Sequence, residues 1–156
     1  MRRSRPATGP VGDALAAGLV AATVSGVPST AWALWRGEGV LEGGRAAGTI
    51  LLGDRAPGPA LHAAAVPLHL ALSLGWAAVL TAAVPRGREI SGGVAGGLAI
   101  AALDLGVVAR RLPRIRALPQ GRQWADHAAY GLAVGLVLRA RRAAAVEVVA
   151  QASTCR

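Results

Sequence analysis

The sequence contains no lysine, no asparagine and no phenylalanine, and it has one cysteine in 156 residues. The single cysteine, Cys155, excludes an internal disulfide, and we expect a free thiol at the end of the chain. Aromatic residues make up only 3% of the chain. Soluble cores usually need larger side chains to fill their volume, so an ordinary soluble core is disfavoured.

The apolar residues that are present are small, and they make up much of the chain. Hydrophobic residues reach 53%, mainly Ala, Leu and Val, and there are 21 glycines. Close packing between membrane helices favours such small residues. Pairs spaced by four, which allow two helices to approach closely, are Gly18 and Ala22, Ala22 and Gly26, Gly92 and Gly96, Gly93 and Gly97, and Gly131 and Gly135.

The positive charge consists entirely of arginine. The 17 basic residues against eight acidic residues give a net charge of +9, which raises nucleic acid as a partner. The arginines lie in short gaps between apolar runs, however, and few aromatic side chains are available to stack on bases. We therefore expect the partner to be a lipid bilayer with anionic headgroups, not nucleic acid. A protein partner or a second copy of the chain stays open.

Four apolar runs predict an all-α integral membrane four-helix bundle, because each approaches the length that crosses a bilayer. The fourth run is short, and the arginines after it can extend to the interface. Loops one and three are expected to carry short interfacial segments. The predicted spans are about 14–35, 61–84, 91–110 and 125–140, within one domain at 14–140 between basic tails at 1–13 and 141–156.

The first run has a rival interpretation as a cleaved signal peptide. "MRRSR" would supply its charged start, and "AWA" at 31–33 resembles a cleavage site. The run is long for that purpose, and Ser25, Pro28, Ser29 and Thr30 crowd its end. We therefore treat it as a span, kinked at Pro28 as the second span is at Pro67.

Asp104 is the charge within the third run, and burying an isolated charge at the bilayer centre costs about 3 kcal/mol or more. It should therefore face the bundle, on the same helix face as Gly93 and Gly97. His69 of the second run lies at a similar predicted depth, since adjacent spans run antiparallel. We expect His69 to pair with Asp104, while His127 or an arginine of loop three are the alternative partners.

The other polar residues within the runs lie at the same predicted level. We expect a one-sided intramembrane polar cluster in the half that faces loops one and three, with almost no internal polar groups in the opposite half apart from Thr81. Its members are Ser25, Ser29, Thr30, His69, Asp104, His127 and Tyr130.

This cluster has several interpretations. It can tie the helices together, form a proton-coupled or solute-binding cavity, hold a metal through His69, Asp104 and His127, or hold a haem between histidines. HExxH, GxSxG and phosphate-binding glycine loops are absent. We expect a non-enzymatic accessory or binding protein without catalytic residues, metal or cofactor; the alternative is a small proton-coupled or solute transporter.

Several stretches together resemble uncharacterised small four-span membrane proteins of high-GC bacteria. They are "GVPSTAWAL", "RAAGTILL", "LHLALSLGWAAVL" and "ALDLGVVARRLPRIRALPQGRQWADHAAYGLAVGLVL". The resemblance covers about residues 12–140 and implies a fold and a location in the bacterial cytoplasmic membrane. It implies no catalytic residue. The arginines are almost evenly divided between the two sides, and we expect both termini in the cytoplasm because Arg2, Arg3 and Arg5 precede the first span.

Overall fold

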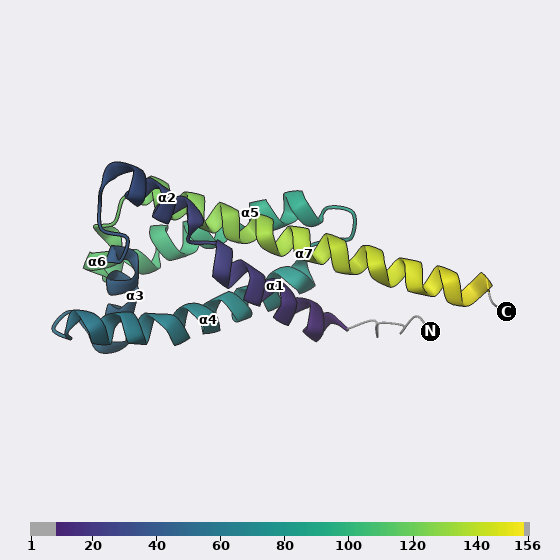
Figure 1. Cartoon of the computed structure of the whole chain (residues 1–156), viewed down its shortest axis with the longest axis horizontal. Helices are drawn as coiled ribbons and strands as arrows, with labels where there is room; N and C mark the ends of the chain where they lie inside the picture. Colours follow the sequence, from purple (N-terminus) through teal and green to yellow (C-terminus); the bar gives the residue numbers. More distant parts are fainter. Residues whose placement is uncertain (1–8, 155–156) are drawn as a thin grey trace.

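The computed structural model describes residues 9–154, in which all regular structure is helical (Figure 1). The predicted all-α class is therefore confirmed. The elements are α1 (Pro10–Val24), α2 (Val27–Arg36), α3 (Glu42–Leu52), α4 (Gly58–Ala83), α5 (Glu89–Gly106), the 3-10 helix η1 (Val108–Arg111), α6 (Pro113–Arg116) and α7 (Gln120–Thr154).

Three segments of the described chain are long and apolar enough to cross a membrane. They are Pro10–Arg36, which joins α1 and α2, Gly58–Ala83, and Glu89–Arg111. They correspond to the first three predicted spans. The predicted fourth span lies inside α7 and does not belong to this set, because Asp126 and Arg139 leave only a short apolar stretch between them.

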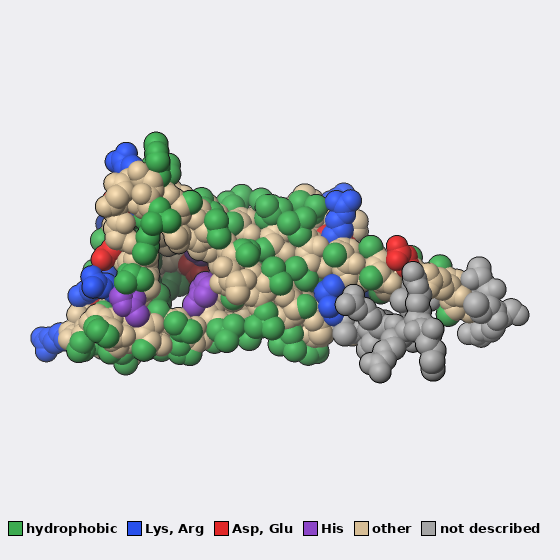
Figure 2. Space-filling model, in the orientation of Figure 1, with side chains coloured by type: hydrophobic (Ala, Val, Ile, Leu, Met, Phe, Trp, Pro, Cys, Tyr) green, Lys and Arg blue, Asp and Glu red, His purple; other side chains and the backbone are tan. Residues whose placement is uncertain are grey.

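Many large apolar side chains point outward, and the interior combines alanines with a few larger side chains. Leu15, Val66 and Leu136 are about half exposed or more, whereas Ala17, Ala21 and Ala77 are fully buried. Leu61, Val134 and Leu138 are the largest side chains that are fully buried. Figure 2 shows an apolar surface between two levels at which arginine side chains gather. Exposure of so many large apolar side chains is unusual for a soluble protein and is expected where lipid replaces water around the helices.

Helices α5 and α7 form the tightest pair, and glycines make it possible. A methyl group added at Gly93 would lie 3.0 Å from the Cα of Gly135, and one added at Gly97 would lie 3.1 Å from the Cα of Gly131. The carbonyl oxygens of Gly131 and His127 would lie closer still to these two methyl groups, nearer than real side chains approach a backbone. The predicted close approach at these four glycines is therefore confirmed, and they join α5 to α7.

The first span loses one of its two neighbours at its interruption. Before it, α1 packs against both α4 and α7, and Gly18 lies against Leu74 and Ala77 of α4. After it, the main neighbour of α2 is α7. The interruption at Ser25 and Gly26 is thus the point at which the first span leaves α4 and stays against α7.

Loops one and three meet at one end of the molecule, where α2, α3 and α6 gather (Figure 1). Helix α3 is the short helix expected in loop one, and it packs against α4. Arg114 of α6 forms an ion pair with Asp54 at 2.9 Å, which joins the third loop to the first. Arg122 pairs with Glu38 in the same region.

The opposite end holds the described start of the chain, the loop between α4 and α5, and the later part of α7. The expected N-terminal tail, 1–13, is shorter than predicted, because α1 already begins at Pro10. Residues 1–8, Cys155 and Arg156 lie outside the described residues. The expected C-terminal tail is largely helical, because α7 continues without interruption to Thr154. Figure 1 shows this helix projecting beyond the other helices.

Candidate functional site

The interruption of the first span leaves backbone groups without their usual helical partners. Helix α1 ends at Val24, and Pro28 has no N–H with which to bond the carbonyl of Val24. Gly26 adopts φ −79° and ψ 1°, which breaks the run of helical hydrogen bonds. Such groups are tolerated at membrane depth only where protein or water covers them.

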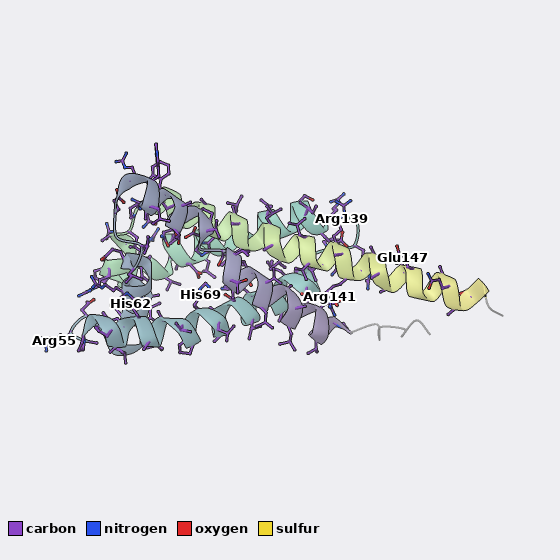
Figure 3. All side chains as sticks on the ribbon, viewed as in Figure 1. Arg55, His62, His69, Arg139, Arg141 and Glu147 are labelled. Atoms are coloured by element: carbon purple, nitrogen blue, oxygen red, sulfur yellow. The ribbon has the colours of Figure 1, made fainter. Side chains whose placement is uncertain are left out.

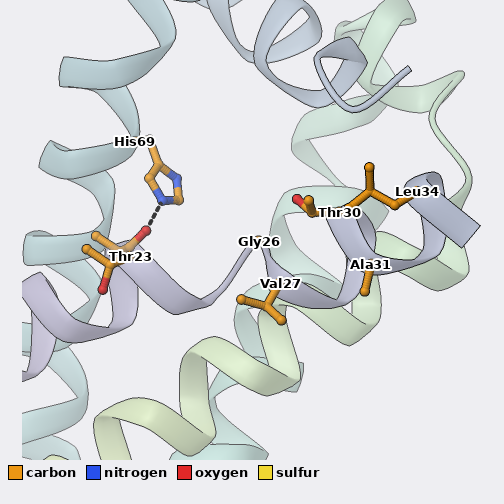
Figure 4. Close-up of a pocket in the computed structure, with 8 residues that line it drawn as sticks. Thr23, Gly26, Val27, Thr30, Ala31, Leu34 and His69 are labelled. Atoms are coloured by element: carbon orange, nitrogen blue, oxygen red, sulfur yellow. Dashed lines mark hydrogen bonds between the residues drawn. The ribbon is translucent and has the colours of Figure 1, made fainter. Parts of the chain in front are cut away.

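His69 covers the first of these groups. Its Nε2 lies 3.0 Å from the carbonyl oxygen of Ala22, one helical turn before the interruption (Figure 4). Because a carbonyl oxygen only accepts hydrogen bonds, Nε2 must carry the proton. The Nδ1 lone pair of the neutral ring then stays available. Figure 3 shows His62 and His69 projecting from the same side of α4.

Asp126 covers a second group. The backbone N–H of Ser29 in α2 donates to Oδ1 of Asp126 in α7 at 2.9 Å, although the two residues are 97 positions apart in sequence. Ser29 lies in the first turn of α2, where backbone N–H groups lack helical acceptors and where the helix dipole favours a negative charge. Asp126 therefore acts as an N-terminal cap supplied by another helix.

Asp104 and His127 form the third polar contact. Oδ2 of Asp104 lies 3.4 Å from Nε2 of His127, and Nδ1 of His127 lies 2.7 Å from the carbonyl oxygen of Gln123. The carbonyl requires the proton on Nδ1, so the Asp104 contact needs one further proton between Oδ2 and Nε2. The pair thus holds this proton either as imidazolium with carboxylate or as neutral ring with carboxylic acid. Asp126 lies within electrostatic reach of both His127 and His69.

The prediction that His69 pairs directly with Asp104 is wrong. Asp104 takes His127, the alternative partner, and His69 takes the backbone of α1. The predicted depths did not determine the rotation of the helices. Because α5 packs on α7 through glycines, its polar face turns toward α7 and away from α4.

The structure distributes the other predicted cluster residues unevenly. Ser25 is buried, and its hydroxyl has no hydrogen-bond partner within the described residues. Thr30 is exposed at the side of the first span. The Tyr130 hydroxyl donates to the carbonyl of Ser73, and both residues are buried in the core. We use the term break site for the interruption and its polar neighbours: Ala22, Ser29, His69, Asp104, Asp126 and His127.

Polar contacts also occur at the opposite end, between residues that flank the predicted spans. Arg141 donates to Asp13 at 2.6 Å, and Arg142 donates to Glu89 at 3.2 Å. Arg142 also donates to the carbonyls of Thr81 and Val84, both at 3.0 Å, where α4 ends. The sequence could have predicted these ion pairs. Because successive spans alternate in direction, the starts of spans one and three lie on the same side of the membrane as the end of span four.

A groove runs alongside the interruption with a volume of about 420 Å³. Figure 4 shows its lining, and Figure 2 shows the surface hollowed beside the histidine side chains. No charged side chain lines this groove. The lining residues are Ala22, Thr23, Gly26, Val27, Thr30, Ala31, Leu34 and His69.

The structure does not assemble the metal site considered from the sequence. His127 pairs with Asp104, while His69 bonds the α1 backbone. Within residues 9–154, no three His, Cys, Asp or Glu side chains come together as a metal-binding group.

Comparisons with known proteins give no relative of this chain. No protein-family model matches the sequence, and neither the curated proteins nor the solved structures yielded a match.

Proposed function

We propose that this chain is a four-span protein of the bacterial cytoplasmic membrane, and that it serves as a non-enzymatic binding or accessory protein through its break site. The observation that carries the proposal is the interrupted first span. One helix supplies a histidine for its freed carbonyl, and another supplies an aspartate for its freed N–H. Irregular backbone at membrane depth is typical of helices that line binding sites.

The contacts of α7 support its role as the fourth span. Its uncharged stretch, 128–138, is about 16 Å long at 1.5 Å per residue, which is short for a bilayer. Its charged flanks are paired inside the bundle, however: Asp126 with Ser29, and Arg141 with Asp13. Pairing lowers the cost of placing these groups near lipid, so hydropathy alone underestimates this helix.

Labelling of single cysteines tests the four-span arrangement. Cys155 is first replaced by serine, and one cysteine is then placed at Gly39, Gly87, Gly121 or Ala152, which lie before and after the second, third and fourth spans. Four spans require that positions 39 and 121 react from one side of the membrane and that positions 87 and 152 react from the other. Reaction of 121 and 152 from the same side, or of 39 and 121 from different sides, would overturn the proposal.

A second candidate, a proton-coupled carrier, is favoured by the proton that Asp104 and His127 must share. A proton-leak measurement distinguishes the two functions. It uses purified protein reconstituted into vesicles that contain a pH-sensitive dye. A binding protein gives the same proton leak as empty vesicles under an imposed potential. A carrier gives a faster leak that Asp104→Asn abolishes, and that result would replace the binding role.

A further inference from the structure

We infer that the groove at the break site binds a small, neutral, lipid-soluble molecule that carries a hydroxyl group, and that this hydroxyl donates a hydrogen bond to Nδ1 of His69. The inference rests on the proposed binding function and adds the chemical class of the ligand. It depends on the lining of the groove, the tautomer of His69 and the direction in which the groove opens.

The lining requires a neutral ligand. Its eight residues include no charged side chain, and five of them are Ala, Gly, Val or Leu. A charged ligand would enter without a counter-ion in surroundings of low dielectric constant, which is costly. The volume of about 420 Å³ falls within the usual range of small-molecule sites.

The side-chain hydrogen bonds in the groove favour a ligand that is a hydrogen-bond donor. His69 uses its Nε2 proton on the carbonyl of Ala22, and the described structure contains no hydrogen bond at Nδ1. Thr23 uses its hydroxyl proton on the carbonyl of Val20 at 2.7 Å. Both side chains therefore offer lone pairs and no proton to the groove. A hydroxyl matches them, whereas a ligand with acceptors alone has only Thr30 as a side-chain donor.

The groove opens to the side of the molecule, where lipid would lie. Val27 is 58% exposed and Leu34 is 68% exposed on its rim. In Figure 4 these residues follow α2 away from Gly26, while His69 faces the interruption from α4. A lipid-soluble ligand can therefore reach His69 from the bilayer without crossing the packed interior.

A quinol and its oxidised quinone form a matched pair of probes, because they share ring and tail and differ in whether they carry hydroxyl donors. We expect purified protein in lipid nanodiscs, under anaerobic conditions, to bind decylubiquinol at least about fivefold more tightly than decylubiquinone. Fivefold corresponds to one hydrogen bond of about 1 kcal/mol. Equal affinity for the two probes, or no binding of either, would overturn the inference.

Three variants locate the binding. His69→Leu should lower quinol affinity to the quinone level. The matched control is His62→Leu on the same helix, which removes a similar bond to the carbonyl of Leu41 outside the groove and should leave affinity unchanged. Ala31→Leu fills the exposed groove while keeping the His69 bond, and should weaken both probes. Quinol affinity that His69→Leu and Ala31→Leu leave intact would contradict the assignment.

Monodecanoylglycerol distinguishes the two sources of a neutral hydroxyl. Binding as tight as that of the quinol, and equally dependent on His69, supports a neutral glycerolipid as ligand. Binding of the quinol alone supports a ring-bearing ligand. Both outcomes keep the hydroxyl inference. Cysteine labelling tests the four-span arrangement, and ligand binding tests the groove. The two proposals can therefore fail independently, and the measurements show which one has failed.

Discussion

Oδ1 of Asp126 accepts the backbone N–H of Ser29 at 2.9 Å, and this bond joins the start of α7 to the first turn of α2. Neither residue has its partner nearby in sequence. The bond lies where the interrupted first span begins again, so it determines how α2 is held against α7. Its removal should affect α2 before it affects the remainder of the bundle.

Asp126→Ala should lower the free energy of unfolding by about 1 kcal/mol, the usual value of an N-terminal cap. Asp126→Asn keeps an oxygen acceptor for Ser29 and should cost less. Denaturant titration in mixed micelles measures both variants. The cap assignment does not survive if the Asn and Ala variants are equally destabilised.

Asp104→Asn should be mild for folding, because an amide N–H can donate to Nε2 of His127 in place of the shared proton. Asp104→Leu leaves Nε2 without a partner and should cost about 1–3 kcal/mol more. Thermal unfolding of the two variants tests this difference. Equal loss of folded protein would mean that the carboxylate itself is required.

The wild-type His127 ring should carry a proton on Nδ1, because this atom faces the carbonyl of Gln123 at 2.7 Å. Nitrogen NMR shifts of selectively labelled histidine distinguish this form from the common neutral tautomer with the proton on Nε2. His69 provides the internal contrast, since its bond to Ala22 requires a proton on Nε2. A neutral Nε2–H tautomer at His127 would contradict the one-proton pair.

Gly131→Ala should separate α5 from α7, because the added methyl group would lie 3.0 Å from the Cα of Gly97 and closer still to the backbone of Gly93. We expect destabilisation of about 1–3 kcal/mol from overpacking. Gly75→Ala is the matched control, since Gly75 lies within α4 with no atom near the added carbon. Alanine there should be neutral or stabilising. Similar unfolding free energies for the two variants would exclude the glycine contact.

Arg142→Ala should destabilise the protein more than a substitution of an exposed arginine does, because it leaves the Glu89 carboxylate and the carbonyls of Thr81 and Val84 without their donor. Arg139→Ala is the control, since Arg139 is exposed and lies near the same end (Figure 3). Chemical unfolding in detergent measures both. An Arg142 variant as stable as the Arg139 variant would show that this cluster is dispensable.

Hydropathy predicted where the helices lie along the chain and at what level the polar groups meet, because the cost of burying charge acts on each helix separately. It did not predict how each helix is rotated, which depends on contacts between pairs. The information was present in the glycines. Asp104 shares a helix face with Gly93 and Gly97, and His127 shares one with Gly131 and Gly135. Considering the two faces together would have paired α5 with α7, and Asp104 with His127.

The two ends of the bundle show what single-helix patterns miss. The cap on Ser29 requires an interruption that Pro28 indicated and a partner on another helix that nothing nearby in sequence identifies. Helix α7, by contrast, continues through 141–154 beyond the other helices, as the alanine-rich sequence there favours. Long-range pairing determined the cap, whereas local propensity determined the continuation of α7.

Helix α1 is held between two neighbours, α4 and α7, whereas the main neighbour of α2 is α7. The segment of the first span that is held least is therefore α2. If α2 tilts on α7, the backbone at Ser25 and Gly26 is the hinge that must absorb the movement. Such a tilt would move Val27 and Leu34 relative to His69, so occupancy of the groove would be coupled mechanically to the position of α2.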